Sequence, residues 1–389
     1  MTGETRRGTG RHRSIVLAVT VDLSLGLIDG FAHYLVESGW DVRVVSGPGA
    51  YADRLRDSGI QLHEIKMSRE PDPVRDLRSL LAWIRILREI RPDVIVAGTP
   101  KAGLLGTIAA WITRVPDRVY IVRGLRLETS TGVLRQVLTV LEKLTFALST
   151  RALSVGPSLR DEILRLKLTR PSKVWVLGKG SSNGVDIMRF VPRPVPDETS
   201  DSLRESLGLD PALPTIGFVG RLNRDKGLDT LREALHLIAA GPIRLQLLLV
   251  GGQDGGVLSD QEHVGGNVRI VRTGQVLDTS AYYPLLDVFC LPTRREGFPN
   301  VVLEAAASGV PTITTDATGA VDSVVDGVTG LIVKTDDPSA LAEAILQLLS
   351  DDELRARMGE NARRWVVDDF DQATVWNRTI DFLMKNRAS

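Results

Sequence analysis

The sequence predicts an α/β protein made of two doubly wound domains, each a mostly parallel sheet covered by helices on both faces. Short apolar, β-rich runs alternate with amphipathic helical stretches almost from end to end. This alternation pauses once, in a polar and proline-rich stretch near the middle, and then restarts. The length of 389 residues also fits two domains, at about 100–200 residues per domain.

In the first half, several predicted strands are near-continuous hydrophobic runs, as a parallel sheet buried on both faces requires. Two long stretches, 74–90 and 133–149, place apolar residues at three- and four-residue intervals and are expected to be helices. The predicted strands of this half are 14–20, 41–46, 93–97, 118–122, 151–155 and 173–178.

The proline-rich stretch 191–213 is typical of a linker between domains. We therefore expect a disordered basic lead-in at 1–13, an N-terminal domain at 14–190 and a C-terminal domain at 214–370. A last helix within 371–389 is expected to pack back on the N-terminal domain. The predicted strands of the second half are 215–219, 244–250, 268–272, 287–291, 311–314 and 330–333, and its predicted helices include 300–308, 338–350, 352–367 and 372–386.

The charge is unevenly distributed along a chain that is neutral in total. Residues 1–200 hold 30 Lys and Arg against 21 Asp and Glu, and the remainder holds 18 against 27. A basic first half favours an anionic partner there, and uneven solvated charge explains the same counts equally well.

The single cysteine, Cys290, excludes an internal disulfide, favours a reducing compartment and is expected to be buried. The five histidines have no metal-ligand spacing, so we expect no zinc site. The N-terminus lacks the apolar region of a secretory signal, and no apolar run is long enough to span a membrane.

Positive charge gathers in the loop after strand 215–219. In the stretch GRLNRDKG, Gly220 and Gly227 bracket Arg221, Arg224 and Lys226 at a strand-to-helix turn. Cationic side chains beside open backbone N–H groups at a helix N-terminus form a receptor for phosphate. A solvated basic turn is the alternative, and the two glycines weigh against it.

Two glutamates stand eight residues apart in the stretch REGFPNVVLEAAASGVP. Glu296 lies in a Gly- and Pro-containing loop, and Glu304 lies one turn into the helix expected at 300–308. The first amides of that helix add a partial positive charge. Carboxylates accept strong hydrogen bonds from sugar hydroxyls. The two glutamates, the first amides of the helix and the basic loop together fit one ligand, a nucleotide diphosphate sugar bound in a cleft between the domains.

With these motifs the chain resembles, over essentially its whole length, the retaining GT-B glycosyltransferases of family 4, which have two Rossmann-like domains. The resemblance is carried by EGFPNVVLE, FVGRLNRDKG and GVPTITTDATGAVDSVVDGVTGLIV. In the first half, TPKAGLLGTIAA, VYIVRGLRLE and GKGSSNGVDIMRF resemble the bacterial polysaccharide-assembly branch, which extends lipid-linked sugars.

The resemblance implies a role for each matching residue. Arg221 and Lys226 bind the donor diphosphate and stabilise the leaving group, so that neither a metal ion nor another cofactor is expected. Glu296 hydrogen-bonds hydroxyls of the transferred sugar, and Glu304 binds the ribose. The other donor-side residues that it implies are Gly26, Gly220, Gln275, Val276, Gly297, Phe298, Asn300 and Val301.

On the acceptor side, Lys101 and Arg123 are candidates for contacts to phosphate. Arg123 stands before Gly124 where the family frequently has a histidine, so no histidine base is expected. Helices 74–90 and 133–149 carry cations beside apolar residues. Such helices suit an anionic membrane surface or a polyprenyl diphosphate, and equally an ordinary helix with a solvated arginine face.

The sequence thus predicts a retaining, metal-independent hexosyl or N-acetylhexosaminyl transferase. Its donor is a nucleotide diphosphate sugar, UDP-linked by family habit, and its acceptor is a polyprenyl diphosphate saccharide of bacterial surface polysaccharide synthesis. We expect a cytoplasmic protein that contacts the inner face of the plasma membrane through its N-terminal domain and binds no nucleic acid. Two alternatives stay open: the same transfer to a soluble small-molecule or natural-product acceptor, and a nucleotide-sugar epimerase or inactive binding relative.

Overall fold

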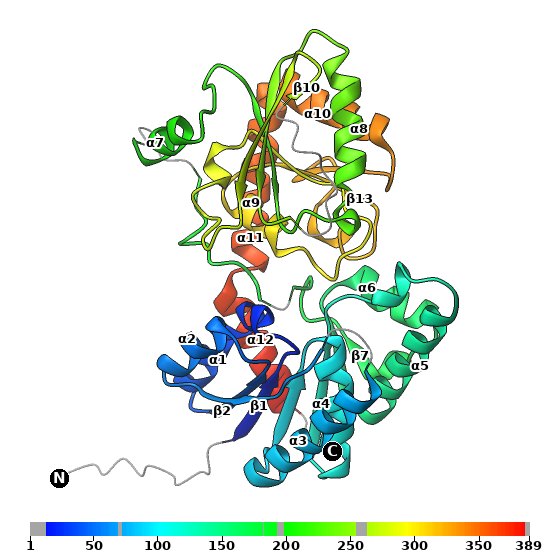
Figure 1. The fold of residues 1–389 in the computed structure, drawn as a ribbon. Coiled ribbons are helices and arrows are strands. Elements are labelled where there is room, and N and C mark those ends of the chain that lie inside the picture. The colour runs from blue at the N-terminus through cyan, green and yellow to red at the C-terminus, as the bar shows by residue number, and fades with distance from the viewer. Residues whose placement is uncertain (1–12, 69–71, 182, 193–197, 254–262, 386–389) are drawn as a thin grey trace, which may run out of the picture. The chain divides into compact units, whose positions relative to one another are not determined.

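The computed structural model describes residues 13–68, 72–181, 183–192, 198–253 and 263–385, and the chain forms two α/β units (Figure 1). Unit 1 comprises Met1–Arg123, Ser130–Leu153 and Ile163–Trp175. Unit 2 comprises Gly124–Thr129, Ser154–Glu162 and Val176–Ser389. The predicted lead-in at 1–13 lies outside the described residues except for Arg13.

Unit 1 is built on a seven-stranded sheet with the order β3-β2-β1-β4-β5-β6-β7. β1 lies between β2 and β4 and is parallel to both, so the winding direction reverses between β1 and β4. All residues of β1 and β4 are buried, as expected for central strands. The strands are β1 (Ser14–Ala18), β2 (Asp41–Ser46), β3 (Gln61–Glu64), β4 (Val94–Ala97), β5 (Asp117–Val122), β6 (Arg151–Ser154) and β7 (Val174–Trp175).

Helices α3, α4 and α5 pack side by side, and α4 also packs on β4 and β5. α3 begins where Asp72 accepts a hydrogen bond from the N–H of Arg75 at 3.0 Å and Pro73 occupies the first turn. Trp83 and Leu87 of α3 are buried in the core of this face. The helices are η1 (Asp22–Leu27), α1 (Asp29–Glu37), α2 (Ala50–Asp57), α3 (Pro73–Ile90), α4 (Pro100–Ile112), α5 (Gly132–Leu148) and η3 (Pro171–Lys173).

Unit 2 repeats the same winding around a second seven-stranded sheet, with the order β10-β11-β9-β8-β12-β13-β14. β8 pairs in parallel with β9 and β12, which makes the gap between β8 and β12 its switch point. Only the short edge strand β10 runs antiparallel among the pairs of this sheet that the structure describes. The strands are β8 (Thr215–Val219), β9 (Leu245–Val250), β10 (His263–Val264), β11 (Val268–Gly274), β12 (Val288–Leu291), β13 (Thr312–Thr315) and β14 (Gly330–Val333).

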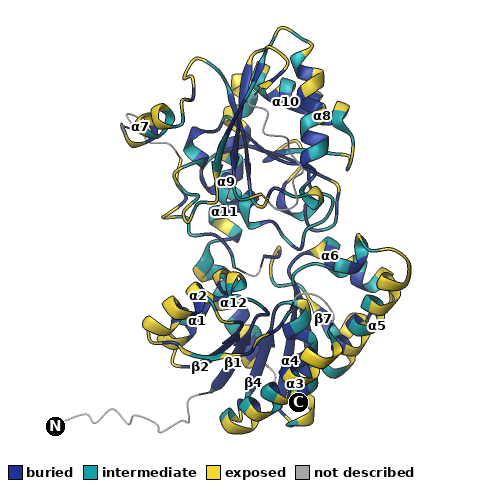
Figure 2. Ribbon diagram, viewed as in Figure 1, coloured by how far each residue is buried: buried dark blue, intermediate teal, exposed yellow. Residues whose placement is uncertain are grey.

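In unit 2, α8 packs against α10, whereas α9 packs against α11. The strands are largely buried and the outer faces of the helices are exposed, which matches the burial expected of a covered parallel sheet (Figure 2). The helices assigned to this unit, or reaching it from unit 1, are η2 (Arg126–Glu128), α6 (Pro157–Arg165), α7 (Glu198–Ser206), η4 (Arg224–Lys226), α8 (Leu228–Ala239), η5 (Tyr283–Leu285), α9 (Asn300–Ala307), η6 (Val321–Ser323), α10 (Pro338–Ser350), α11 (Asp352–Asp369) and α12 (Gln372–Met384).

The predicted fold class, two doubly wound α/β domains, is confirmed, and the expected strands and helices form within a few residues of their predicted ends. No strand was predicted at β3, because its QLHE segment has only one aliphatic residue in four. This polar composition fits its position at the edge of the sheet. The predicted linker contains α7. The cleft between the domains and the packing of the last helix on the N-terminal domain stay predictions.

Candidate active site

The loop after β8 is held in place by glycines. Gly227 has φ +68°, and a Cβ atom on it would lie 1.7 Å from the carbonyl O of Pro292, the residue after β12. A Cβ atom on Gly251, after β9, would lie 2.0 Å from the carbonyl O of Gly220. Because only glycine allows such close backbone approaches, the turn that carries Lys226 is pressed against the ends of β9 and β12.

Residues of the loop after β12 reach across to the same turn. The hydroxyl of Thr293 and the N–H of Arg294 donate to the carbonyl O of Asp225, at 3.0 and 2.9 Å. The guanidinium of Arg295 pairs with the Asp225 carboxylate at 2.8 Å, and that of Arg294 pairs with Asp229 of α8 at 2.8 Å. These contacts join the two loops that flank the switch point of unit 2.

Lys226 and Glu296 form an ion pair between these two loops. Their side chains are 20% and 14% exposed, so the pair is less screened by water than one on an open surface. The ammonium group can bind a phosphate oxygen and the carboxylate can accept from a hydroxyl. The structure therefore brings together two of the three residues predicted to be catalytic. The third, Arg221, is exposed on the same turn.

A third loop encloses the backbone around Glu296. The N–H of Glu296 donates to the carbonyl O of Thr318 at 2.8 Å. Gly319 has φ +76°, and a Cβ atom on it would lie 2.4 Å from the carbonyl O of Gly297. The position of Glu296 thus depends on a loop after β13 as well as on its own.

Ser158 and Asp322 hold that third loop from the other side. The hydroxyl and N–H of Ser158 donate to the Asp322 carboxylate at 2.7 and 2.9 Å, and the N–H of Gly319 donates to the Ser158 hydroxyl at 2.8 Å. Burial raises the pKa of Asp322 above its ordinary value, although the hydrogen bonds from Ser158 oppose this rise. We call this arrangement the Ser158–Asp322 clasp; the sequence analysis missed it because its members lie 164 residues apart.

The start of α9 presents backbone donors beside Glu296. Pro299 precedes the helix and provides no side-chain cap, so the first-turn N–H groups of Asn300 and Val301 have no acceptor within the helix. The ring of Phe298 packs instead, with its centroid 5.4 Å from that of Phe370. The side chain of Phe298 is therefore held by this packing, and its backbone is the part left for the predicted contact with the donor.

Glu304 lies farther along α9 and points toward a buried tyrosine. Tyr283 donates a hydrogen bond to Glu304 Oε2 at 2.6 Å, and the hydroxyl of Thr279 donates to the same atom at 3.4 Å. Burial raises the pKa of Glu304, and these two hydrogen bonds counteract part of the rise. Glu304 is half-buried, and its carboxylate is held by Tyr283 and Thr279, which the sequence analysis did not single out.

Gln275 and Val276 follow β11 at the same edge of the sheet. A Cβ atom on Gly252, after β9, would lie 3.6 Å from Gln275 Cβ, which places Gln275 beside the end of β9. Val276 packs partly buried against the core of unit 2. The predicted base-binding residues thus lie at strand ends next to the switch point.

The remaining predicted residues lie in unit 1. Gly26 is an exposed residue of η1, where an added Cβ would meet nothing within 4 Å. Lys101, in the first turn of α4, pairs with Asp76 of α3 at 2.7 Å. Arg123 follows β5 and donates to the carbonyl O of Leu27 at 3.4 Å. Burial lowers the pKa of Arg123 to about 10, so it stays charged at neutral pH.

In the part of the chain that the structure describes, no group of three or more His, Cys, Asp or Glu side chains could hold a metal ion. Cys290 is buried, and burial raises its pKa to about 12. Such a thiol is protonated at neutral pH and is a poor nucleophile.

Two family models match most of the chain. A model of glycosyl transferases group 1 matches residues 199–365, and a model of a glycosyl transferase 4-like domain matches residues 28–180. The first therefore spans the loops of Lys226 and Glu296, and the second spans most of unit 1.

Individual proteins align over nearly the full length. The capsular polysaccharide biosynthesis glycosyltransferase CapM of Staphylococcus aureus is 37% identical over 371 residues, covering 94% of this chain and 95% of its own. The N,N'-diacetylbacillosaminyl-diphospho-undecaprenol alpha-1,3-N-acetylgalactosaminyltransferase of Campylobacter jejuni is 26% identical over 355 residues, covering 89% and 92%. The Anabaena protein HepE, solved with UDP-glucose, shares the fold with a TM-score of 0.76 at 20% identity, covering 96% of this chain and 99% of its own.

Proposed function

The chain belongs to the family-4 glycosyltransferases of the GT-B fold and is a glycosyltransferase of capsular polysaccharide or lipid-linked sugar assembly, and from this premise we propose its finer function. The protein moves a hexosyl or N-acetylhexosaminyl group from a UDP-linked donor, with retention at the anomeric carbon, to a hydroxyl of a polyprenyl diphosphate saccharide. The observation that carries the proposal is the Lys226–Glu296 ion pair at the switch point of unit 2.

A nucleotide diphosphate sugar offers charge complementary to this pair. Its diphosphate can take the place of the Glu296 carboxylate beside Lys226, with Arg221 on the same turn as a second cation. Glu296 is then free to accept from hydroxyls of the transferred sugar. The helix N-terminus at Asn300 adds a partial positive charge for the diphosphate. Glu304 accepts from the ribose hydroxyls, and Gln275 and Val276 contact the base.

Catalysis in this arrangement rests on stabilising the leaving diphosphate. The bond from the anomeric carbon to the β-phosphate oxygen breaks while the acceptor oxygen bonds to the same face of the sugar. The acceptor proton passes to the departing phosphate oxygen, so no protein base is required. Cations placed where leaving-group charge develops are worth roughly 3–4 kcal/mol each, which assigns Lys226 and Arg221 the role that a divalent cation plays in other transferases.

Two features of the compared proteins support the finer assignments. The Campylobacter relative is named for an α-1,3 linkage made to a diphospho-undecaprenol saccharide. An α-linked nucleotide sugar gives an α-linked product only with net retention. HepE was solved with UDP-glucose, which supports a UDP-linked donor.

The donor is tested by thermal shift with a panel of nucleotide sugars. Ligand that binds only the folded state raises the unfolding temperature by mass action. We expect UDP and one or a few UDP-sugars to raise Tm, and GDP-sugars to leave it unchanged. Larger shifts with GDP-sugars would overturn the choice of nucleotide, and loss of the UDP shift in Lys226→Ala would locate the binding site.

The acceptor is tested by transfer assays with the donor so identified. A detergent-solubilised polyprenyl diphosphate saccharide should be glycosylated, and the same saccharide without its lipid should not. Transfer to soluble saccharides or small molecules alone would favour the alternative acceptor class. Isomerisation of the nucleotide sugar without any acceptor would indicate an epimerase.

Helix α5 supports a membrane contact of unit 1. It exposes four large apolar side chains on one face, and the cations Arg135 and Lys143 are exposed on the same helix. No helix among the described residues is both long and apolar enough to cross a bilayer. A basic amphipathic helix instead lies in the interface plane of an anionic membrane, here the inner face of the plasma membrane. The four apolar residues are Val133, Val137, Val140 and Leu144.

This contact is tested by co-sedimentation with vesicles of phosphatidylcholine and phosphatidylglycerol at low salt. The wild type should sediment with them, and the double substitution Val133→Ser, Val140→Ser should reduce the bound fraction severalfold. Val36→Ser, on α1 and 47% exposed, is the matched control and should sediment like the wild type. A wild type that stays in the supernatant contradicts the contact.

A further inference from the structure

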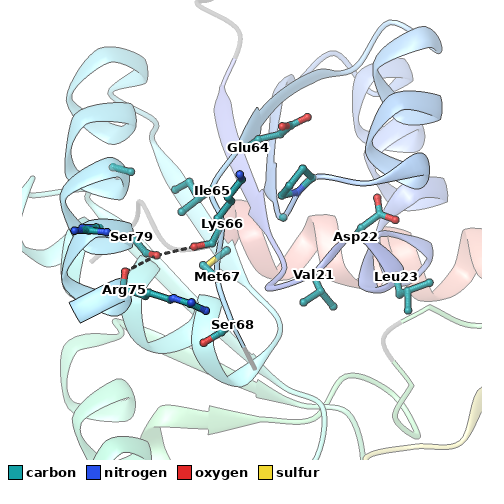
Figure 3. Close-up of a pocket in the computed structure, with 14 residues that line it drawn as sticks. Val21, Asp22, Leu23, Glu64, Ile65, Lys66, Met67, Ser68, Arg75 and Ser79 are labelled. Atoms are coloured by element: carbon teal, nitrogen blue, oxygen red, sulfur yellow. Dashed lines mark hydrogen bonds between the residues drawn. The ribbon is translucent and has the colours of Figure 1, made fainter. Parts of the chain in front are cut away.

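Unit 1 contains a cavity of about 870 Å³ that includes none of the predicted site residues (Figure 3). Its wall is formed by the loops after β1 and β2, the segment after β3 and one face of α3. Its volume falls within the range of about 300–1,000 Å³ that is usual for small-molecule sites. The charged residues of the wall are three cations, Lys66, Arg75 and Arg78, and two carboxylates, Asp22 and Glu64.

Both carboxylates have partners outside the cavity wall. Asp22 Oδ1 accepts from the N–H of Ala52 in the first turn of α2, at 2.7 Å. Glu64 accepts from the guanidinium of Arg56, also in α2, at 2.6 Å. Their charge is therefore already compensated by a helix N-terminus and by an arginine.

The cations are less compensated. Arg75 lies 3.3 Å from Asp72, but its side chain is 73% exposed. Neither the ammonium of Lys66 nor the guanidinium of Arg78 has a hydrogen-bond or ion-pair partner among the residues that the structure describes. Although the wall has nearly equal numbers of positive and negative groups, the charge left to interact with a ligand is positive. The cavity therefore favours an anion.

A buried serine holds the backbone of two of these cationic residues, Lys66 and Arg75. The hydroxyl of Ser79, a buried residue of α3, lies 2.9 Å from the carbonyl O of Lys66 and 2.9 Å from that of Arg75. This bond ties the segment after β3 to α3, as the dashed lines in Figure 3 show. A frame fixed in this way loses little conformational entropy when a ligand binds.

The rest of the wall is apolar. Ile65 and Met67 are buried, and Leu23 on the opposite side is 61% exposed. A free phosphate would contact only the cations of this wall. An anion joined to a hydrocarbon chain can contact both the cations and the apolar side chains.

We propose that this cavity binds the diphosphate and the first isoprene units of a lipid-linked acceptor, with Lys66 and Arg78 contacting phosphate oxygens and Leu23, Ile65 and Met67 contacting the chain. The assignment rests on the proposed function, since it locates the acceptor's lipid anchor on unit 1. It also separates the arginines of α3: Arg75 and Arg78 line the cavity, whereas Arg85 and Arg88 do not.

Calorimetric titration of the full chain with farnesyl diphosphate tests this site, with saturating UDP present to occupy the diphosphate site of unit 2. We expect farnesyl diphosphate to bind at least about tenfold more tightly than inorganic pyrophosphate or farnesol. The double variant Lys66→Ala, Arg78→Ala should bind farnesyl diphosphate at least tenfold more weakly than the wild type does, a loss of about 1.4 kcal/mol or more. Arg85→Ala, an exposed arginine of the same helix outside the cavity, is the matched control and should bind like the wild type.

Unchanged binding in the double variant overturns the site, and so does an equal loss in Arg85→Ala. Pyrophosphate binding as tight as that of farnesyl diphosphate overturns the hydrocarbon part. All substituted residues are exposed, so the fold and the UDP-induced rise in Tm should be retained.

If the proposed function fails instead, farnesyl diphosphate binds the cavity but no nucleotide sugar supports transfer to any acceptor. If only the cavity fails, transfer to the lipid-linked saccharide proceeds and is insensitive to the double substitution.

Discussion

The two units wind their central strands in the same order but fill their switch points differently. In unit 2 the loops after β8 and β12 carry the Lys226–Glu296 pair and the arginine contacts of Asp225 and Asp229. In unit 1 the hydroxyls of Thr20 and Thr99 lie 2.7 Å apart at the corresponding point between β1 and β4, and the partly buried guanidinium of Arg123 donates to the carbonyl O of Leu27 in the loop after β1. One fold thus places an ion pair of opposite charges at one switch point, and two hydroxyls beside a partly buried cation at the other.

The difference shows that topology fixes where a ligand can bind, while side chains decide which ligand it is. The free positive charge of unit 1 lies away from its switch point, in the cavity between α3 and the segment after β3. A donor diphosphate and an acceptor diphosphate can therefore be bound by separate groups of cations. Four substitutions test this division of roles.

The largest effect is expected from Lys226→Ala. In the proposed mechanism it removes a cation from the leaving group, and it should lower kcat/KM by roughly 100-fold or more, about 3–4 kcal/mol. The fold should be retained, because Glu296 is partly exposed and water can hydrate its carboxylate after Lys226 is removed. Steady-state kinetics with the identified donor measures the effect, with Arg357→Ala, an exposed arginine of α11, as the control. A variant that keeps more than about a tenth of kcat/KM would contradict the role of Lys226.

A substitution in unit 1 should change stability and leave the donor site unaffected. Glu142 of α5 is buried and accepts a hydrogen bond from Tyr120 at 3.1 Å, and burial raises its pKa from 4.5 to about 7. The raised pKa means that the stability linked to this group is full below pH 4.5 and is lost as the pH rises to about 7. Glu142→Gln should therefore raise the free energy of unfolding by up to about 3 kcal/mol near pH 8.

Thermal unfolding of both proteins between about pH 5 and pH 8 measures this difference. The gap in Tm between variant and wild type should widen as the pH rises, and the shift caused by UDP should be the same in both. A gap that does not depend on pH would show that Glu142 does not titrate in this range.

The Ser158–Asp322 clasp tests whether Glu296 needs support from the loop after β13. Asp322→Ala removes the acceptor of the Ser158 hydroxyl and N–H groups. We expect kcat to fall about tenfold, roughly 1.4 kcal/mol, because Glu296 is less well positioned, while KM for the donor changes little. Asp322→Glu should restore part of kcat, which a general loss of stability would not explain. An unchanged kcat in Asp322→Ala would show that the clasp is only structural.

The smallest effect on catalysis is expected from Glu304→Gln. The amide keeps an acceptor for Tyr283 and removes the charge. If Glu304 binds the ribose as proposed, ground state and transition state lose the same contact. KM for the donor should rise up to about tenfold with kcat nearly constant. A large fall in kcat instead would place Glu304 nearer to the reacting atoms than the ribose.

Loop positions after parallel strands were predictable from the sequence, because short apolar runs mark the strands and ligands bind at their carboxyl ends. For this reason the sequence alone predicts Lys226 and Glu296 as site residues. Their direct pairing was not predictable, since it depends on the approach of Gly227 to Pro292. The clasp of Ser158 with Asp322 and the bond of Tyr283 to Glu304 also join residues distant in sequence, which local patterns do not report.

The backbone contacts of Gly227 and Gly319 set a limit on engineering this protein. Neither position has room for a methyl group, so saturation mutagenesis should return glycine alone at both. Gln275 and Val276, in contrast, have side chains that no described hydrogen bond or ion pair holds in place. A library that aims at a new donor base should therefore vary residues 275–276 and leave the two glycines untouched.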